Sequence, residues 1–571
     1  MLPDAIAFTL YILLAGGVCA RYWIGLYRVS LVRPADHVWS AWLLSHAAHA
    51  LRHLENPLAG LPGHVPGGPA LLPGTAGVGS TVPLAPVTLL LGPQIAYALW
   101  LTLAFAGTAA TAYWVLSRYL VTSRVAAFVG ALVCAFAPGI MWHGNGQPSY
   151  VTNFLIPLIV IRTIRIAHGR VLRNGLLLGL LVAWQFFINP EVLVLTGLAG
   201  GTAALCYTAA LCYWRMGGAP AGDRPALRGL GVALLTAGAL VAVPLGYLSS
   251  RLTAPVPGAP GEDVTTFAVY WRDSLAGFYT AGHGIGDIEQ NSWFGLSLMV
   301  LALIVPALMW QQGRAARVVI VTGGVFGLLS LGTTVFLNGR STHLPGPWWL
   351  VGKVPGLAAV PATRLALVTV TCLALLLAIA SDRLPTPDPV SYGLTFRRVW
   401  IVALVVALLP AAPRPLQAAG TSAAAPPFIT QGGWRPYVAA GQTVVPIFDT
   451  AGALDVAVFH AAALTEFPVP ADLLAGPDPS GTASATSTSP TVRLLMAVAK
   501  SGDVPEITDK MRDDARADLR AWHASILVLA NGGKWELRMW NLVTRLVGQV
   551  PNQIGGAWVW DVRALTRGPA S

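Results

Sequence analysis

Residues 93–116 read PQIAYALWLTLAFAGTAATAYWVL and contain no charged side chain. A helix needs about 20 mainly apolar residues to cross the hydrocarbon core of a bilayer, so this stretch predicts one transmembrane span. Comparable apolar blocks recur along the chain of 571 residues, of which 55% are hydrophobic and 11% charged. A soluble protein carries roughly 25% charged residues. The sequence therefore predicts a mostly α-helical, polytopic membrane bundle.

About eleven spans are expected, beginning with a helix at 5–22. No Lys or Arg precedes that helix and no clear cleavage site follows it, so we interpret it as retained rather than as a signal peptide. The apolar block 81–116 is too long for one span, and its prolines and glycine predict a short half-inserted segment before residue 93. The other expected spans are 125–142, 151–166, 174–188, 191–214, 227–247, 293–310, 318–337, 361–379 and 399–409.

Topology accounts for the formal net charge of +11. Most arginines lie in alternate connections, such as 162–173 and 383–398, and short loops rich in Lys and Arg face the cytoplasm. The N-terminus is then cytoplasmic and the C-terminal part extracytoplasmic, and no nucleic-acid partner is needed to explain the charge. The five cysteines lie within or beside apolar blocks without zinc-site spacing, so we expect no disulfide framework.

The first outer loop holds the main catalytic candidate, Asp36. The segment that it opens, DHVWSAWLLSHAAHAL, has apolar residues at helical spacing and predicts a helix in the membrane interface, with Trp39 and Trp42 as anchors. Asp36 is either a plain N-cap or a general base whose pKa burial can tune, and the pattern favours neither. The loop histidines, such as His46 and His49, fit an amphipathic surface better than a metal site, so no metal ligand is assigned.

Further polar candidates lie near the outer ends of other spans. His143 and Gln147 belong to the motif HGNGQ, which alone is typical of an ordinary turn. Glu191 either profits from the dipole at a helix start or lines a cavity as an acid. Arg364 either extends its head group to the interface or binds an anionic phosphate. Loop 249–292 is rich in polar residues, including Asp263 and Arg272, most of them expected to be solvated.

Several segments, in this order along the chain, carry a family resemblance. After Asp36 and its helix come ENPL and PGG, the span at 93–116, CAFAPGIMWHGNGQPSYVTNFLIPLIV (134–160), WQFFINPEVLV (184–194) and SLGTTVFLNGRSTHLPGPWWLVGKVPGLAAVPATRLAL (330–367). This pattern resembles membrane glycosyltransferases of the GT-C fold, of the actinobacterial type with an outer C-terminal domain. The resemblance covers roughly residues 1–415.

The resemblance implies inverting transfer of a sugar from a polyprenyl phosphate to a cell-envelope glycan, lipid or protein at the outer face of the plasma membrane. It implies that Asp36 is the general base. Such enzymes often have two adjacent acids there, whereas this chain has Asp36-His37. Whether His37 assists, whether another acid substitutes, or whether the chain is less active stays open. The supporting candidates are His37, Glu55, Glu191 and Asp263.

The chemistry implied by the resemblance assigns roles to several further residues. The leaving phosphate needs a cation, for which the candidates are Arg364, Lys353 and Arg272. Acceptor-binding candidates are His143, Gln147 and Trp348. No cofactor is assigned with certainty, and a divalent cation (Mg, Mn or Ca) is left open. The expected partners are the lipid-phosphate sugar donor, the acceptor and membrane lipids.

The C-terminal part, 416–571, follows a linker that reads LQAAGTSAAAPP. Strand-like and helical segments alternate after it: GQTVVPIFDT, a helix near 503–522, ASILVLA, WELRMWNLVTRLVG and GGAWVWDVRAL. This order predicts a small soluble α/β domain beside a membrane domain at 1–415. Its tryptophans are candidate sugar platforms, although a core position is favoured for each one.

Two other functions compete with the enzyme. A transporter or flippase of lipid-linked precursors would show internal repeats and charges in the middle of its spans, and neither is evident. A non-catalytic scaffold of GT-C type remains an alternative because the acidic pair is altered at His37.

Overall fold

The computed structural model describes residues 2–26, 30–31, 34–58, 77–166, 170–214, 232, 234–240, 296–337, 340–351, 362–383, 392–409, 412–419, 425–448, 458–459, 461–470, 473 and 489–566. The chain divides into two compact units. The helical unit comprises residues 1–21, 100–245 and 254–416. The mixed unit comprises residues 22–99, 246–253 and 417–571, so it groups the first loop with the C-terminal part. The domain boundary expected at 415/416 stays a prediction.

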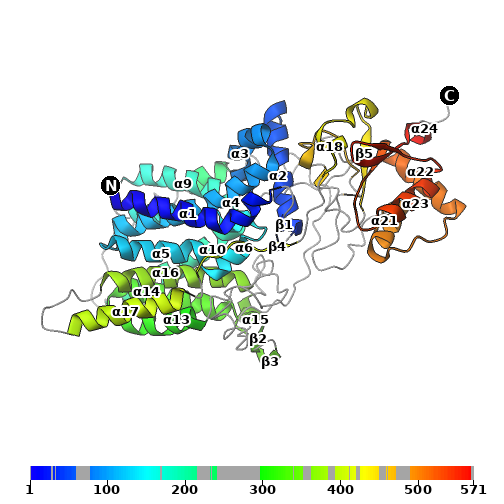
Figure 1. Cartoon of the computed structure of the whole chain (residues 1–571). Helices are drawn as coiled ribbons and strands as arrows, with labels where there is room; N and C mark the ends of the chain where they lie inside the picture. The colour runs from blue at the N-terminus through cyan, green and yellow to red at the C-terminus, as the bar shows by residue number, and fades with distance from the viewer. Residues whose placement is uncertain are drawn as a thin grey trace. The chain divides into compact units, whose positions relative to one another are not determined.

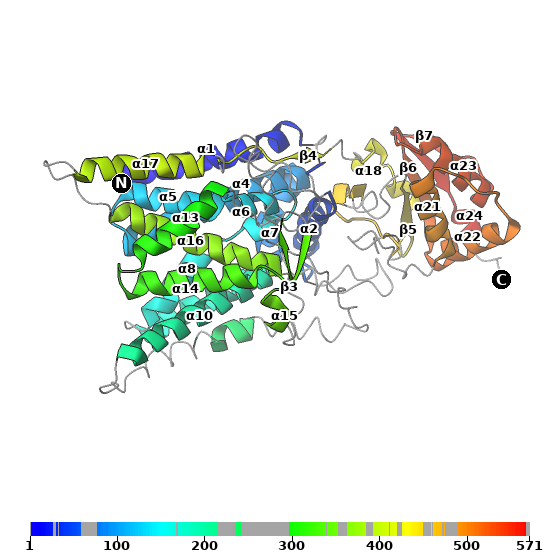
Figure 2. The same ribbon diagram turned by 90° about the horizontal axis from the view of Figure 1, so that it is seen from below.

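Helices make up most of the helical unit, as Figures 1 and 2 show, and two of them, Leu2–Ile24 and Pro93–Val115, extend into the mixed unit. The described helices are α1 (Leu2–Ile24), α4 (Pro93–Val115, continued by the π-helix Leu116–Leu120), α5 (Arg124–Phe136), α6 (Pro138–His143), α7 (Pro148–Val151), α8 (Ile156–Ile166), α9 (Val171–Ile188), α10 (Pro190–Trp214), α13 (Leu296–Met309), α14 (Arg314–Leu329), α15 (Trp348–Val351), α16 (Ala366–Asp382) and α17 (Tyr392–Leu408). The chain is mostly helical, as the sequence predicts.

Five of the described helices are long and apolar enough to cross a membrane: Leu2–Ile24, Pro93–Leu120, Arg124–His143, Val171–Ile188 and Pro190–Thr208. Shorter apolar helices cover Val78–Leu91, Leu298–Met309 and Ala366–Asp382. The chain is therefore a membrane protein with several transmembrane helices, whereas the number of eleven spans and their orientation stay predictions. Of the expected span 227–247, only residues 232 and 234–240 are described.

Small residues allow close packing in the centre of the helical unit, where α16 lies between α5 and α14. A Cβ atom on Gly130 of α5 would lie 2.8 Å from Cβ of Ala378, and one on Gly323 of α14 would lie 2.9 Å from Cβ of Cys372. Both partners belong to α16. Helices in a bilayer associate largely through such packing, because lipid tails are as apolar as the side chains.

The expected span 318–337 is wrong at its end. Helix α14 stops at Leu329, and residues Thr334–Leu337 form strand β2, which pairs antiparallel with β3 (Arg340–Pro345). The cause is local, because Gly332 has φ +77° and turns the chain before a run of β-branched residues. Gly346 after β3 packs against the carbonyl of Gly332 so closely that no side chain fits there.

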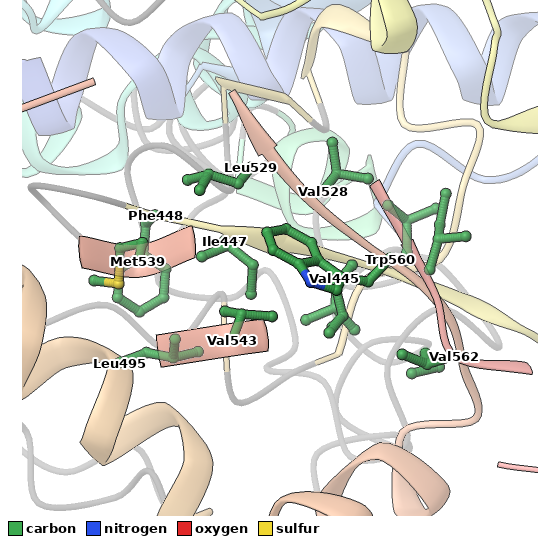
Figure 3. Packing of buried hydrophobic residues seen from close by; sticks show 14 of the residues in the cluster. Val445, Ile447, Phe448, Leu495, Val528, Leu529, Met539, Val543, Trp560 and Val562 are labelled. Atoms are coloured by element: carbon green, nitrogen blue, oxygen red, sulfur yellow. The ribbon is translucent and has the colours of Figure 1, made fainter. Parts of the chain in front are cut away.

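In the mixed unit, a four-stranded sheet has the order β5-β6-β8-β7. Strands β5 (Thr443–Ile447) and β6 (Ala524–Ala530) are parallel, while β8 (Ala557–Asp561) is antiparallel to both β6 and β7 (Asn552–Ile554). Helices α21 (Pro490–Ser501), α22 (Asp509–Ala521) and α23 (Glu536–Val547) pack on it. Figure 3 shows the buried core around Trp560 and Met539.

The same unit contains the first loop. Helix α2 (Pro34–His53) packs against α3 (Val78–Leu91), the segment that was expected to be half-inserted. Pro83 and Pro86 lie inside α3, which is nevertheless helical through Leu91 and ends at Gly92 with φ +86°. Strand β1 (Ser30–Leu31) pairs with β4 (Ala418–Ala419), which lies in the predicted linker.

Candidate functional site

A cluster of polar residues lies at one end of the helical unit, where α6, α7, α10 and α16 begin or end. Asn189 caps α10, since its Oδ1 accepts the backbone N–H groups of Glu191 at 3.0 Å and Val192 at 3.2 Å. Pro190 is the first residue of α10, a position where the backbone N–H that proline lacks would have no partner within the helix. Glu191 therefore lies in the first turn, where the helix dipole favours a carboxylate.

Two turns bring the other members of the cluster to it. His143 ends α6, and Gly146, with φ +147°, turns the chain toward α7. Tyr150 lies on α7, and Arg364 lies in the 3₁₀ turn Ala362–Leu365 that precedes α16. Four of the predicted site residues thus come together in one place: His143, Gln147, Glu191 and Arg364.

Tyr150 joins these residues into one network. Its hydroxyl donates to Glu191 Oε2 at 2.6 Å and accepts from Arg364 Nη1 at 2.6 Å. Arg364 and Glu191 also form a direct ion pair, with side chains 14% and 19% exposed. The guanidinium carbon lies 4.6 Å from the centre of the Tyr150 ring. Burial raises the pKa of the Tyr150 hydroxyl above its usual range, so the phenol stays protonated and remains a donor.

His143 extends the network to Gln147. Its ring stacks on Tyr150 with centroids 4.9 Å apart and planes at 21°. Its Nδ1 lies 2.8 Å from Gln147 Oε1, which assigns the ring proton to Nδ1. Two buried atoms of the ion pair, Glu191 Oε1 and Arg364 Nε, have no hydrogen-bond partner within the described part of the chain. The ion pair thus keeps one acceptor, Glu191 Oε1, and one donor, Arg364 Nε, that no described residue uses.

Trp348 is buried, with 6% of its side chain exposed, and packs with a small apolar cluster of Leu195, Phe326, Ala362 and Leu365. It therefore supports the turn that carries Arg364. This burial does not favour a sugar platform, and the acceptor-binding role stays a prediction.

In the mixed unit, Asp36 lies in the first turn of α2 and is partly exposed. The helix already begins at Pro34, so Asp36 lies inside its first turn and not ahead of it. Both interpretations, a helix-capping carboxylate and a general base, stay predictions. The backbone carbonyl of Asp36 accepts a bond from Ser40 Oγ at 2.8 Å. Glu55 follows the other end of α2 and folds back, so that its carboxylate lies 3.8 Å from His49 Nε2. His49 is roughly 20 Å from Asp36 along the helix, so the two acids do not form a pair.

His37 is held among aromatic rings. Its Nε2 lies 2.9 Å from the Tyr22 hydroxyl, which itself donates to Gln94 Oε1 at 2.6 Å. Because the phenol proton is used on Gln94, His37 donates through Nε2. The rings of His37 and Tyr97 lie 4.5 Å apart. Burial lowers the pKa of His37 to about 4, so the ring is neutral at neutral pH. Its contact with Tyr22 orients the start of α2, and an imidazole cannot supply the negative charge of a second acid.

The interpretation of the loop histidines as surface residues is wrong for three of them. His37, His46 and His49 are 4%, 2% and 7% exposed. The interfacial anchor Trp42 is likewise buried, at 7%, whereas Trp39 is exposed. Among the described residues, no group of three His, Cys, Asp or Glu side chains could hold a metal ion. Asp263, Arg272 and Lys353 lie outside the described residues.

Comparison with solved structures identifies the fold. The chain is similar to a variant of arabinofuranosyltransferase AftD from Mycobacteria, with a TM-score of 0.52 and 17% sequence identity over 93% of this chain. It spans 37% of the length of that protein. It also matches the oligosaccharyltransferase AglB of Archaeoglobus fulgidus, in complex with an inhibitory peptide and a dolichol-phosphate, with a TM-score of 0.46 and 12% identity over 92% of this chain and 69% of that one.

No protein-family model and no curated protein sequence matches the chain. The likeness to the arabinofuranosyltransferase assigns the chain to the GT-C fold, as the sequence resemblance predicts. At this level of identity the likeness concerns the fold, and the reaction, the donor and the acceptor are matters of proposal.

Proposed function

We propose that the chain is an inverting membrane glycosyltransferase that moves a sugar from a polyprenyl phosphate to a cell-envelope glycan, lipid or protein. The observation that carries the proposal is the GT-C likeness to an arabinofuranosyltransferase over 93% of the chain. The proposed location is the plasma membrane, with the N-terminus in the cytoplasm and the site at the outer face, because the arginine-rich loops alternate along the chain.

The placement of charge supports an enzyme over a transporter. In the five helices that can span a membrane, every acidic or basic residue lies within four residues of an end. Transporters carry ionisable groups near the middle of the bilayer, at broken helices. The buried ion pair of Glu191 and Arg364 instead lies at the end of the helical unit, where a lipid phosphate at the membrane surface could reach it.

In the proposed reaction, Asp36 is the general base. The acceptor hydroxyl loses its proton to the Asp36 carboxylate while its oxygen attacks the anomeric carbon of the donor sugar. The bond between that carbon and the phosphate oxygen breaks, and the polyprenyl phosphate leaves with the electron pair. Support comes from the partial exposure of Asp36 at the start of an otherwise largely buried helix.

Arg364 is the proposed cation for the leaving phosphate, with Lys353 and Arg272 as further candidates. Tyr150 and Glu191 hold Nη1 of Arg364, so the guanidinium is fixed before a ligand arrives. Its Nε has no partner among the described residues and is the donor that remains for a phosphate oxygen. His143 and Gln147, which adjoin this network, are the proposed acceptor contacts, and Glu191 is a supporting residue.

The test is transfer by the purified full chain in lipid nanodiscs, with a panel of polyprenyl-phosphate sugars and envelope acceptors. We expect transfer from at least one donor and no detectable transfer by Asp36→Asn. Asp503→Asn is the matched control, since it makes the same change at an exposed aspartate of the C-terminal part to which no role is assigned, and it should retain activity. Full activity of Asp36→Asn in correctly folded protein refutes the base assignment, and inactivity of the wild type with every donor refutes the function.

A further inference from the structure

Helix α2 contacts a short segment from the C-terminal part of the chain, within the mixed unit. Ser45 Oγ donates to the backbone carbonyl of Ala461 at 2.9 Å, and both residues are buried. Trp42 and Leu43 pack against the same alanine in a small buried cluster. A buried hydrogen bond together with apolar packing fixes this part of α2 against the segment at 461–470.

An ion pair makes a second contact. Arg52, in the last turn of α2, pairs with Glu466, whose side chain is 16% exposed. The other carboxylate oxygen of Glu466 accepts from Arg435 at 2.9 Å. Glu466 therefore links α2 to Arg435, which adjoins the C-terminal core through Trp434.

The backbone of the contacting segment is strained. Leu464 and Thr465 have φ values of 51° and 55°, a left-handed conformation that non-glycine residues rarely adopt. Two such residues in a row persist only where the surroundings impose them. Phe467 and Val469 hold the segment in place, since both are fully buried in the C-terminal core. The backbone N–H of Val444 also donates to Pro468 O at 2.8 Å.

The contact reaches more than one side of α2. Leu43 follows Asp36 by seven residues, almost two whole turns, so it lies on the same side of the helix as Asp36. Ser45 follows Asp36 by nine residues, about two and a half turns, so the two lie on opposite sides of α2. The start of α2 is held separately by His37, and the chain ahead of it pairs with residues 418–419 through β1 and β4. The C-terminal part thus contacts the segment around α2 both before the helix and along it.

The geometry points to a positioning role for the C-terminal part: its segment 461–470 contacts α2 on more than one side and fixes the place of Asp36. The inference rests on the proposed function for its catalytic consequence, but the physical contact is independent of it. Ala461 and Glu466 are then positioning residues, and a ligand that shifts the C-terminal core would change turnover through α2.

Hydrogen exchange tests the contact without any substrate. Ala461→Leu overpacks the contact with Trp42 and Leu43. We expect amides of α2 to exchange about tenfold faster, since the strain of overpacking lowers the free energy of local opening. Ala499→Leu is the matched control, because Ala499 is equally buried in the C-terminal core but outside the cluster with Trp42 and Leu43. Unchanged α2 exchange in Ala461→Leu, or equal changes in both variants, overturns the inference.

Kinetics test the catalytic consequence with milder variants. Arg52→Ala and Arg516→Ala each remove one exposed arginine of an ion pair, but only Arg52 lies on α2. We expect Arg52→Ala to lower kcat about threefold at unchanged donor KM, with recovery in Arg52→Lys, and Arg516→Ala to leave kcat unchanged. Equal kcat in all three variants overturns the positioning role. A wild type that transfers no sugar refutes the proposed function instead, while the exchange result still decides the contact.

Discussion

Removing the charge of Glu191 should destabilise the helical unit strongly, because Arg364 would remain buried without its counterion. The side chains are 14% and 19% exposed, so most of the interaction is shielded from water. Deleting one partner of a buried pair costs about 3–5 kcal/mol. Glu191→Gln keeps the shape and an acceptor for Tyr150, which isolates the charge, and the residual exposure favours the lower end, about 3 kcal/mol.

The measurement is equilibrium unfolding in mixed detergent micelles, followed by tryptophan fluorescence, for wild type, Glu191→Gln and Glu191→Gln with Arg364→Met. The double variant should recover to within about 1 kcal/mol of wild type, since apolar replacement of a whole buried pair is often nearly neutral. Arg516→Ala is a control, because its pair with Asp513 is exposed and should contribute about 0.3–0.5 kcal/mol. A loss below about 0.5 kcal/mol for Glu191→Gln would mean that the pair behaves as a solvated surface contact, and the reasoning would fail.

Two further predictions concern stability. Burial lowers the pKa of His37 to about 4. The stability that the neutral ring contributes is complete above the unfolded pKa near 6.5 and is lost as the pH falls toward 4, with a loss of about 2 kcal/mol at pH 5. His37→Gln should therefore flatten the dependence of the unfolding free energy on pH between pH 7 and pH 5. An unchanged profile would contradict a buried neutral histidine. Gly130→Ala should cost about 1–3 kcal/mol, because the new Cβ meets Ala378 Cβ at 2.8 Å and Ala374 O at 3.1 Å. Gly324→Ala, with open space around it, should be neutral or slightly stabilising in the same assay, and equal losses would rule out the packing argument.

Local patterns predicted the helices and strands well. The stretch 93–116 is α4 and its π-helical extension, and ASILVLA is β6 at Ala524–Ala530. WELRMWNLVTRLVG contains α23 at Glu536–Val547. These elements depend on the periodic spacing of apolar residues, which is visible within a short stretch of sequence. The end of the expected span at 337 failed because hydropathy does not distinguish a β-branched strand after Gly332 from a further turn of helix.

The candidate site was predictable residue by residue but not as a network. Glu191 and Arg364 are 173 residues apart in sequence, and no local pattern pairs them. Tyr150, which joins them, was missed, although it follows Gln147 by three residues in the HGNGQPSY motif. The burial of the histidines on α2 was also missed, because it depends on contacts from distant segments, such as Pro57 O on His46 at 3.1 Å.

The pairing of Arg364 with Glu191 bears on selectivity in the proposed reaction. A bare arginine at the membrane surface would bind the phosphate of any lipid head group, since such phosphates are abundant there. The carboxylate of Glu191 reduces the net charge of the pair to zero and already engages Nη1, so a phosphate gains less from this pair than from a bare arginine. A donor that also offers a sugar hydroxyl can donate to Glu191 Oε1 while its phosphate accepts from Arg364 Nε, which satisfies both buried atoms at once. A neutral pair with one open donor and one open acceptor therefore favours a sugar phosphate over a plain phospholipid.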